Sequence, residues 1–299
     1  MKYIIAFLIT FITTPVMIIA AKKFKIVDNP DDFLKPHKKV TPYLGGLALY
    51  IGIFIFFYRD YKFIIPATIL MFLGLYDDIK NVKPILRLVT EAFTITLSVI
   101  LFSETGIAES FFLVFYGIGL INAVNFTDGM DGLCSGVTLI SLLSFYILSN
   151  QINIFIIILT LVAFLVYNFH PAKIFLGDAG SYLLGYIIFY YTLVLYGQYS
   201  FKGFIYAFII AGFFITDMLY AVIRRIHAGK SPFSGDRDHI YDKAMKLYKN
   251  TYKAVFISYL IEITFAVTAV IAFSNIYAGI FIYIVLVLFY GIRYRLYRY

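Results

Sequence analysis

The sequence predicts an all-α integral membrane protein with about eleven transmembrane helices, and three observations carry this prediction. Apolar residues make up 62% of the 299-residue chain, whereas charged residues make up only 14%. Soluble proteins average about 25% charged residues, so this chain has too little charge to cover a water-exposed surface. The mean hydropathy is +0.86. Long apolar stretches recur along the whole sequence without the period-two alternation of a membrane β-barrel.

Each predicted helix is an apolar stretch that approaches the roughly 20 residues needed to cross the bilayer core. Several stretches are short, so ten crossings, or a re-entrant segment, are alternatives. The first stretch is followed by basic residues without a small-residue cleavage motif, which indicates a retained helix and not a signal peptide. The eleven stretches are 4–21, 43–58, 63–76, 88–102, 111–124, 133–148, 154–167, 182–196, 204–223, 254–273 and 276–291.

Basic residues predict the orientation, because lysine and arginine accumulate on the cytoplasmic side of a membrane. With eleven crossings, 21 of the 25 basic residues fall on one side, and only Lys2, Arg59, Lys62 and Lys202 fall on the other. We therefore expect a single multi-pass domain over residues 1–299 in the cell membrane, with the N-terminus outside and the C-terminus cytoplasmic. The net charge of +8 then needs no nucleic-acid partner, although the basic loops can attract anionic membrane lipids.

The acidic residues also gather on the cytoplasmic side, although carboxylates contribute little to orientation. Twelve of the 17 acids lie there. Asp77 and Asp78 follow an apolar run at the inner end of a predicted helix. Adjacent carboxylates repel each other unless a cation holds them, so the pair suits a metal ion, a general base or both. A solvated helix end of mixed charge, with Lys80, Lys83 and Arg87, is the alternative.

A second polar string, NAVNFTDGMDGLCSG, contains Asn122, Asn125, Asp128 and Asp131 at intervals of three residues. Each step of three falls about 60° short of a helical turn, so the four side chains cannot share one face of a straight helix. Two interspersed glycines predict a break after the asparagines, which lets the four side chains converge. Oxygen-bearing side chains suit a hard cation such as magnesium or the polar edge of a base. An ordinary polar turn is the alternative.

A third string, HPAKIFLGDAGS, places Gly177 and Gly180 on either side of Asp178 and makes Ser181 the predicted N-cap of the next helix. Backbone amides at a helix N-terminus attract phosphate, and an aspartate beside them suits the cation that bridges phosphate oxygens. Phe175 offers its ring to a flat base.

The connection 224–253 is the longest hydrophilic stretch and supplies Arg237 and His239. Arginine clamps phosphate and histidine donates to it, so the connection is a candidate lid over a diphosphate. A positive-inside loop is the alternative, and it accounts best for Arg224 and Arg225. The end of the connection has the spacing of a short amphipathic helix on the membrane surface. The apolar positions of that helix are Ile240, Ala244 and Leu247.

Together, four inner segments bring aspartate or asparagine close to basic residues and glycine, which favours a magnesium-bound phosphate or diphosphate site. A membrane transporter with a cytoplasmic ion site is the principal alternative. Transporters usually place coupling carboxylates near the bilayer midplane, whereas nearly all acids here lie at the inner boundary. Glu262 is an exception near mid-helix, either as a functional group or as a carboxyl that bonds to a neighbouring helix.

The strings GLYDDIKN, NAVNFTDGMDGL, KIFLGDAGS and SPFSGDRDHI, in this order, resemble the polyprenyl-phosphate N-acetylhexosamine-1-phosphate transferase superfamily, and KPHKKVTPYLGG adds to the resemblance. The resemblance covers residues 35–242. It implies transfer of a sugar 1-phosphate from a UDP-N-acetylhexosamine to undecaprenyl phosphate or a related polyprenyl phosphate, with magnesium and release of UMP.

The loop SPFSGDRDHI is similar to the WecA/TagO-like branch, which uses UDP-N-acetylglucosamine. The branch that makes the first peptidoglycan lipid intermediate carries three consecutive histidines here, where this chain has only His239. Tyr241 and Asp242 also depart from the WecA-like pattern, which commonly has further histidines. The donor sugar is therefore less firmly implied than the class of reaction.

The resemblance also implies roles for single residues. Asn125 and Asp178 would hold magnesium, with manganese as an alternative ion. Asp128 and Asp131 would bind the uridine diphosphate, and Phe175 is similar in position to a residue that stacks on uracil.

Asp77 and Asp78 resemble an aspartate pair that activates the lipid phosphate, and His239 with Arg237 would hold the donor diphosphate; Asp178 completes the implied catalytic set. Either the lipid phosphate attacks the donor directly or an aspartate forms a covalent intermediate. A phosphate monoester has a second pKa of about 6, which favours direct attack. The exposed aromatic helices also permit a homodimer. A general part in donor binding is implied for Lys38, Lys39 and Thr41.

Overall fold

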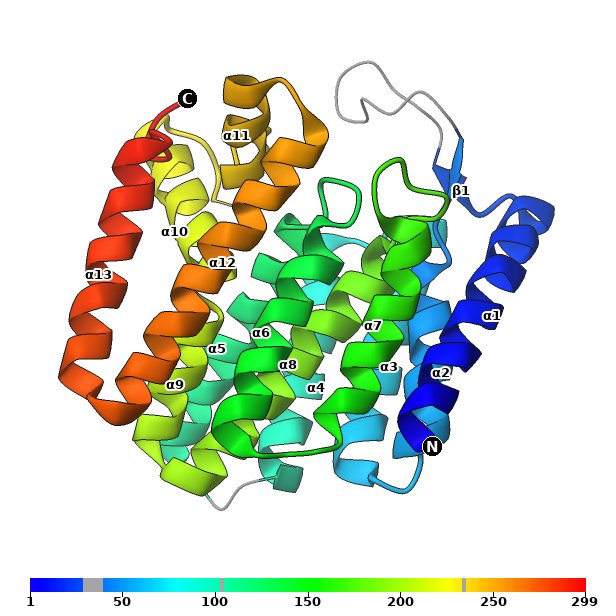
Figure 1. Ribbon diagram of the computed structural model, residues 1–299, viewed down its shortest axis with the longest axis horizontal. Coiled ribbons are helices and arrows are strands. Elements are labelled where there is room, and N and C mark those ends of the chain that lie inside the picture. The colour runs from blue at the N-terminus through cyan, green and yellow to red at the C-terminus, as the bar shows by residue number, and fades with distance from the viewer. Residues whose placement is uncertain (29–39, 103–104, 233–234) are drawn as a thin grey trace.

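The computed structural model describes residues 1–28, 40–102, 105–232 and 235–299. Lys38 and Lys39 lie outside the described residues, so their role stays a prediction. The described chain forms a bundle of helices, with a small antiparallel hairpin at the end that carries the C-terminus and the N-terminus at the opposite end (Figure 1). The elements are α1 Lys2–Phe24, β1 Val27–Asp28, β2 Thr41–Pro42, α2 Gly45–Phe57, α3 Tyr61–Lys80, α4 Pro84–Phe102, α5 Ile107–Phe126, α6 Leu133–Ser149, α7 Ile154–Asn168, α8 Gly177–Tyr199, α9 Phe201–Ile210, α10 Gly212–His227, α11 Ile240–Tyr248, α12 Thr251–Ser274 and α13 Ile276–Arg293.

The helices confirm an all-α membrane protein. Six of the described helices are long and apolar enough to cross a membrane, or seven if the bent pair α9 and α10 forms one span. The eleven predicted stretches all fall on helices, and the ninth falls on that bent pair. The helices α2, α6 and α7 have only 13, 17 and 15 residues. The 20-residue α3 carries charged residues at both ends, from Lys62 to Lys80.

Exposure divides the helices into an outer set and a central one. The helices α1 and α13 lie at two edges of the bundle (Figure 1), and Ile19 and Phe281 on them are each 68% exposed. Such apolar surfaces suit contact with lipid. The helix α8, by contrast, is buried along nearly its whole length. It is therefore the core element against which the others are placed.

Two glycines allow other helices to approach the first turn of α8 closely. A Cβ atom added at Gly46 of α2 or at Gly74 of α3 would overlap the α8 backbone over residues 178–180. Only a residue without a side chain fits such a contact. The approach places the end of α3, with Asp77 and Asp78, against the start of α8.

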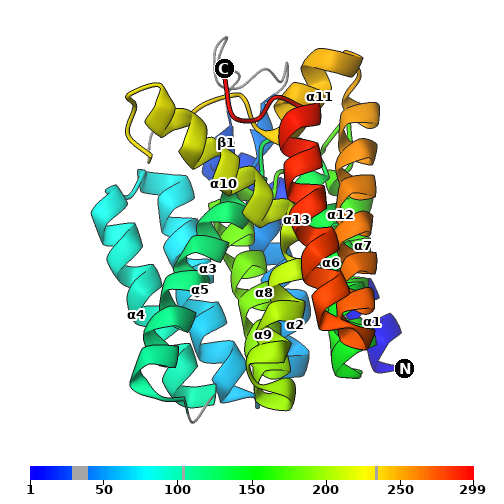
Figure 2. The ribbon, with the colours of Figure 1, turned by 90° about the vertical axis from the view of Figure 1, so that its left-hand side faces the viewer.

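The path of the ninth predicted helix is broken. The helices α9 and α10 are bent by 76° relative to each other, and α10 leans away from the bundle in Figure 2. Just after the break, the Phe213 N–H donates to Glu262 Oε2 at 3.4 Å, and the Ser141 hydroxyl donates to Glu262 Oε1 at 2.5 Å. Of the two alternatives for Glu262, the structure thus shows the carboxyl that bonds to neighbouring helices.

The short helix α11 lies where the amphipathic helix is predicted. Ile240 and Ala244 are buried, but Leu247 is 51% exposed. The connection also starts later than predicted, because α10 continues to His227. Arg224 and Arg225 therefore belong to a helix and not to a loop.

Candidate active site

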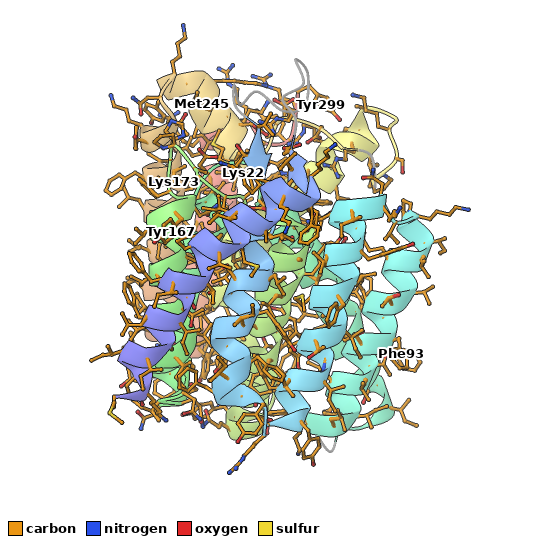
Figure 3. The ribbon with its side chains drawn as sticks, turned by 90° about the vertical axis from the view of Figure 1, so that its right-hand side faces the viewer. Lys22, Phe93, Tyr167, Lys173, Met245 and Tyr299 are labelled. Atoms are coloured by element: carbon orange, nitrogen blue, oxygen red, sulfur yellow. The ribbon has the colours of Figure 1, made fainter. Side chains whose placement is uncertain are left out.

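A polar pocket of about 240 Å³ lies at the end of the bundle where β1, α3 and α8 meet. In Figure 3 the labelled Lys22 and Lys173 lie toward this same end. Three residues predicted from two separate strings, Asp77 and Asp78 from one and Asp178 from the other, contribute to its wall. The lining consists of Val27, Asp28, Tyr43, Asp77, Asp78, Asn81 and Asp178.

Two aspartates from other segments occupy the first amides of α8. The Asp178 N–H donates to Asp78 Oδ1 at 2.8 Å, and the Ala179 N–H donates to Asp78 Oδ2 at 3.2 Å. The Gly177 N–H donates to Asp128. The amides that we expected to attract phosphate therefore hold carboxylates, which satisfy the donors that a helix start leaves free.

The two predicted magnesium ligands are in contact. Asn125, at the end of α5, donates from Nδ2 to Asp178 Oδ1 at 2.7 Å and to Ser181 Oγ at 2.9 Å. The prediction that Ser181 caps α8 is wrong, because α8 begins four residues earlier, at Gly177. Gly177 has a φ of 74°, a left-handed conformation that favours glycine. Asn125 thus fixes the orientation of Asp178.

Asp77 joins three elements at the pocket wall. Its Oδ1 accepts the Val82 N–H at 2.7 Å, and its Oδ2 accepts the Tyr182 hydroxyl at 2.8 Å. Arg87 Nη1 lies 3.7 Å from the same Oδ2. Both oxygens are engaged, so the contacts of Asp77 connect the end of α3 to α4 and α8.

Negative charge is concentrated in the pocket, which Asp28, Asp77, Asp78 and Asp178 line, and at Asp128, which does not line the pocket but accepts from Gly177 beside it. Burial raises the pKa of Asp128 well above its ordinary value, and the carboxylates of Asp178, Asp78 and Asp131 raise it further. A divalent cation would relieve this repulsion, and an all-oxygen set of donors suits magnesium. The described residues contain no ready cluster of three Asp, Glu, His or Cys side chains for a metal ion. Magnesium commonly takes one or two carboxylates and completes its shell with water and phosphate, so the residues present fit it.

Asp131 lies apart from the lining of the pocket. Its Oδ2 is 2.7 Å from His170 Nδ1 and accepts the Ala172 N–H at 3.0 Å. Tyr252 of α12 packs edge-on against His170, with the ring centroids 5.1 Å apart. Asp131 therefore holds the segment that leads from α7 into α8.

Phe175 lies beside the hairpin, and Thr41 is part of it. The Phe175 ring is half-buried and tilted against Tyr43, with the centroids 6.1 Å apart, and its N–H donates to Pro42 at 2.8 Å. Thr41 pairs with Asp28 in the hairpin. The hairpin thus connects the predicted base-stacking residue to the pocket wall.

His239 forms part of a second, buried cluster. Its Nδ1 is 2.6 Å from Asp217 Oδ2, and its Nε2 is 3.5 Å from Asp236 Oδ1. The second Asp217 oxygen accepts the Ile240 N–H at 2.7 Å. Burial alone would lower the pKa of His239, but Asp217, aided by Asp236 and Asp242, outweighs burial and raises it. The imidazole is therefore held in its charged form to a higher pH than usual.

Two buried arginines donate hydrogen bonds to Asp236. Arg224 Nη2 donates to both of its oxygens, at 2.9 and 3.0 Å, and Arg225 Nε donates at 3.2 Å. Burial alone would raise the pKa of Asp236, but the two arginines outweigh burial and lower it. Arg224 also donates to the Leu296 carbonyl at 2.7 Å. The interpretation of the two arginines as loop charges is wrong, because they anchor the connection to α10.

Arg237 completes this cluster together with Tyr241 and Asp242, the two residues that depart from the WecA-like pattern. Arg237 Nη2 lies 3.1 Å from Asp242 Oδ1, and its side chain is 33% exposed. Tyr241 lies parallel to the His239 ring and donates to the Phe126 carbonyl at 3.0 Å. Phe126 ends α5, next to the loop that carries Asp128. The cluster therefore borders the loop of Asp128 and supplies none of the residues that line the pocket.

Replacing Asp217 by Asn is expected to lower the melting temperature more at about pH 6 than at about pH 9. A raised pKa in the folded state stabilises the fold fully below the unfolded pKa, and this stabilisation is lost as the pH rises through the folded value. The asparagine removes the charge that holds the imidazolium. A melting series in detergent across this range measures the difference.

The matched control is Asp238→Asn. Asp238 lies 3.0 Å from Lys243 Nζ and also pairs with Lys246, and lysines keep their charge across this range. Its effect is expected to be similar at every pH. If Asp217→Asn also lowers the melting temperature by the same amount at every pH, Asp217 does not hold a charged His239.

Several site residues were missed by reasoning from the sequence. Asp28 and Tyr43 line the pocket, and Asp217 and Asp236 build the His239 cluster. Asp217 had a usable signal, since a charged residue inside an apolar stretch needs a partner. Asp28 had none, because its position depends on the pairing of the hairpin.

The fold and the pocket define a polytopic membrane protein with a carboxylate-lined site at one end of its helices. Residues 61–196 match the model of glycosyl transferase family 4. The chain is 32% identical to a probable undecaprenyl-phosphate N-acetylglucosaminyl 1-phosphate transferase of Bacillus subtilis, over 96% of this chain and 88% of that relative. It belongs to glycosyl transferase family 4.

Two further relatives represent two kinds of enzyme. One is an undecaprenyl-phosphate alpha-N-acetylglucosaminyl 1-phosphate transferase of Thermotoga maritima, 32% identical over 78% of each chain. The other is a phospho-N-acetylmuramoyl-pentapeptide-transferase of Staphylococcus carnosus, 33% identical over 68% of this chain and 79% of the relative.

Proposed function

We propose that the protein transfers N-acetylglucosamine 1-phosphate from UDP-N-acetylglucosamine to undecaprenyl phosphate or a related polyprenyl phosphate and releases UMP. The observation that carries the proposal is the 32% identity, over 96% of the chain, to a relative of that name. Membership of a transferase family favours this reaction over the transporter that the sequence left as an alternative. The product would be the first lipid-linked intermediate of a cell-envelope glycan.

Two observations bear on the donor sugar: the share of this chain that each relative matches, and the histidine content of the connection before α11. The N-acetylmuramoyl-pentapeptide transferase matches 68% of the chain, less than the 96% and 78% matched by the two N-acetylglucosaminyl transferases. The connection also has only His239 where the former branch carries three histidines. Both observations support UDP-N-acetylglucosamine.

In this proposal the chain crosses the membrane eleven times and the pocket faces the cytoplasm. The positions of 21 of the 25 basic residues support this orientation. The opposite placement of the two termini in Figures 1 and 2 suits an odd number of crossings. A cytoplasmic pocket can receive a water-soluble donor while a lipid acceptor arrives within the bilayer.

Asp178 and Asn125 are the residues that we assign to magnesium. When bound, the ion supplies charge neutralisation for the donor phosphates. Asn125 fixes the Asp178 carboxylate through the 2.7 Å hydrogen bond. Asp78 and Asp128 hold the start of α8, so the Asp178 backbone is also fixed. Positioning of this kind is the principal means of catalysis in phosphoryl transfer.

We assign the donor diphosphate to Arg237 and His239. Asp128 and Asp131 are assigned to binding the uridine diphosphate, and Phe175 to stacking on the uracil ring. The acceptor phosphate is mostly ionised at neutral pH and needs little deprotonation, so direct attack on the donor is preferred to a covalent intermediate. Asp77 and Asp78, whose oxygens accept hydrogen bonds, then act mainly by fixing the pocket.

The proposed reaction is tested by UMP release from UDP-N-acetylglucosamine with undecaprenyl phosphate in detergent, with and without magnesium. Release that needs both the lipid and the metal is the expected result. Release with another UDP-N-acetylhexosamine instead would contradict the donor but keep the class of reaction. No release with any UDP-sugar, from a folded sample, would overturn the proposal.

A further inference from the structure

The helix α4 presents apolar side chains along one face. Ile85, Val89 and Phe93 are 66%, 56% and 61% exposed. Figure 3 shows Phe93 pointing outward, and Figure 2 shows α4 at the edge of the bundle. A helix with this exposure borders lipid. The buried side chains form one stripe with helical spacing, Glu91, Thr94, Ile95, Ser98 and Val99, and the partly buried Arg87 continues this stripe toward the start of the helix.

Arg87 heads this stripe at the end nearest to the pocket. Its Nη1 donates to the Tyr182 hydroxyl at 3.2 Å, and Tyr182 donates in turn to Asp77. Asp77 lines the pocket and lies 3.7 Å from Arg87 Nη1. The Arg87 side chain is 28% exposed. A cation therefore stands between a lipid-facing helix and the wall of the pocket.

The hydrogen-bonding capacity of Arg87 is largely unused within the described structure. A guanidinium carries five N–H donors, and the one hydrogen bond described for it goes to Tyr182. Glu91 Oε1 lies 3.8 Å from Arg87 Nε, beyond hydrogen-bonding distance, and that buried oxygen has no hydrogen-bond partner among the described residues. Glu91 Oε2 instead accepts from Asn122 at 2.7 Å.

Arg224 is an example of an arginine with a purely structural role in this protein. Arg224 is 1% exposed and donates to both oxygens of Asp236 and to the Leu296 carbonyl. Arg87 is partly exposed, approaches two carboxylates without a hydrogen bond to either, and keeps donors free. Such a group is ready to accept a bidentate oxyanion.

We propose that Arg87 binds the phosphate group of the polyprenyl phosphate acceptor. The inference rests on the proposed function, which requires a lipid with a phosphate headgroup to reach the pocket from within the bilayer. A lipid alongside α4 keeps its chain on the exposed apolar face, and its phosphate meets Arg87 next to Asp77. Lys83, which is exposed one turn before Arg87, adds positive charge on the approach.

The test uses the full-length protein in detergent with the variants Arg87→Gln and Arg87→Lys. Binding of radiolabelled undecaprenyl phosphate is measured without donor, and KM is measured for each substrate. Arg87→Gln is expected to weaken lipid binding and raise the lipid KM by about 10- to 100-fold, because it removes charge-assisted hydrogen bonds. The KM for UDP-N-acetylglucosamine is expected to stay unchanged. Arg87→Lys, which keeps the charge without the planar fork, is expected to fall between wild type and Arg87→Gln.

Arg293→Gln is the matched control, since Arg293 is an exposed arginine in the last turn of the outer helix α13. It is expected to bind lipid like the wild type. Unchanged lipid binding in folded Arg87→Gln, or an equal rise in both KM values, would overturn the proposal. The binding assay contains no donor, so it separates this failure from a failure of the proposed reaction.

Discussion

Replacing Asp178 by Asn is expected to lower the rate of UMP release by about 10³-fold at saturating magnesium, the scale seen when one electrostatic group is removed from an active site. Asp178 lines the pocket and accepts a hydrogen bond from Asn125. An asparagine keeps the size of the side chain and can still accept that bond through its carbonyl. The charge is lost but the fold is expected to remain, so the effect reports on the assignment to magnesium.

The control for this variant is Glu109→Gln. Glu109 lies in the first turn of α5, at the end of the bundle opposite to the pocket, and its Oε2 accepts the Gly106 N–H at 3.2 Å. Its loss is expected to leave UMP release near the wild-type rate. Near-normal release by Asp178→Asn, at any magnesium concentration, would contradict the role of Asp178.

Replacing Asp236 by Ala is expected to cause the largest loss of stability, about 3–5 kcal/mol, which is typical when one partner of a buried ion pair is removed. Arg224 and Arg225 are each 1% exposed, and both would keep a buried charge without its carboxylate. A thermal melt in detergent, followed by the loss of monodisperse protein, measures the change. The connection that carries His239 is expected to detach from α10 when this carboxylate is removed.

A combined variant provides the control for that result. Replacing Asp236 by Ala together with Arg224 and Arg225 by Met removes all three charges, and it is expected to melt above Asp236→Ala alone. Wild-type melting of Asp236→Ala would show that the two arginines do not depend on this carboxylate.

Local patterns in the sequence predicted most of the helices. Apolar stretches identified the helices because the backbone must be satisfied internally in lipid. The break between α9 and α10 was not predicted. One of the amide groups near it bonds to Glu262, which lies 49 residues from Phe213. A single apolar stretch contains no sign of such a distant partner.

The sequence predicted which residues belong to the site better than it predicted the contacts between them. The strings that contain Asp77, Asp78 and Asp178 do meet in one pocket. Ser181 was mistaken for a cap because the actual cap, Asp78, comes from a helix 100 residues away. Rules for helix starts consider only neighbouring residues, so they cannot find a cap that tertiary packing supplies.

A labelled donor tests whether the sugar is transferred together with its phosphate. UDP-N-acetylglucosamine that carries ³²P in the β-phosphate is incubated with undecaprenyl phosphate, magnesium and the purified protein, and the lipid is extracted. The label is expected to appear in the lipid while unlabelled UMP is released. Label that stays in UDP or appears as free phosphate, with none in the lipid, would contradict it.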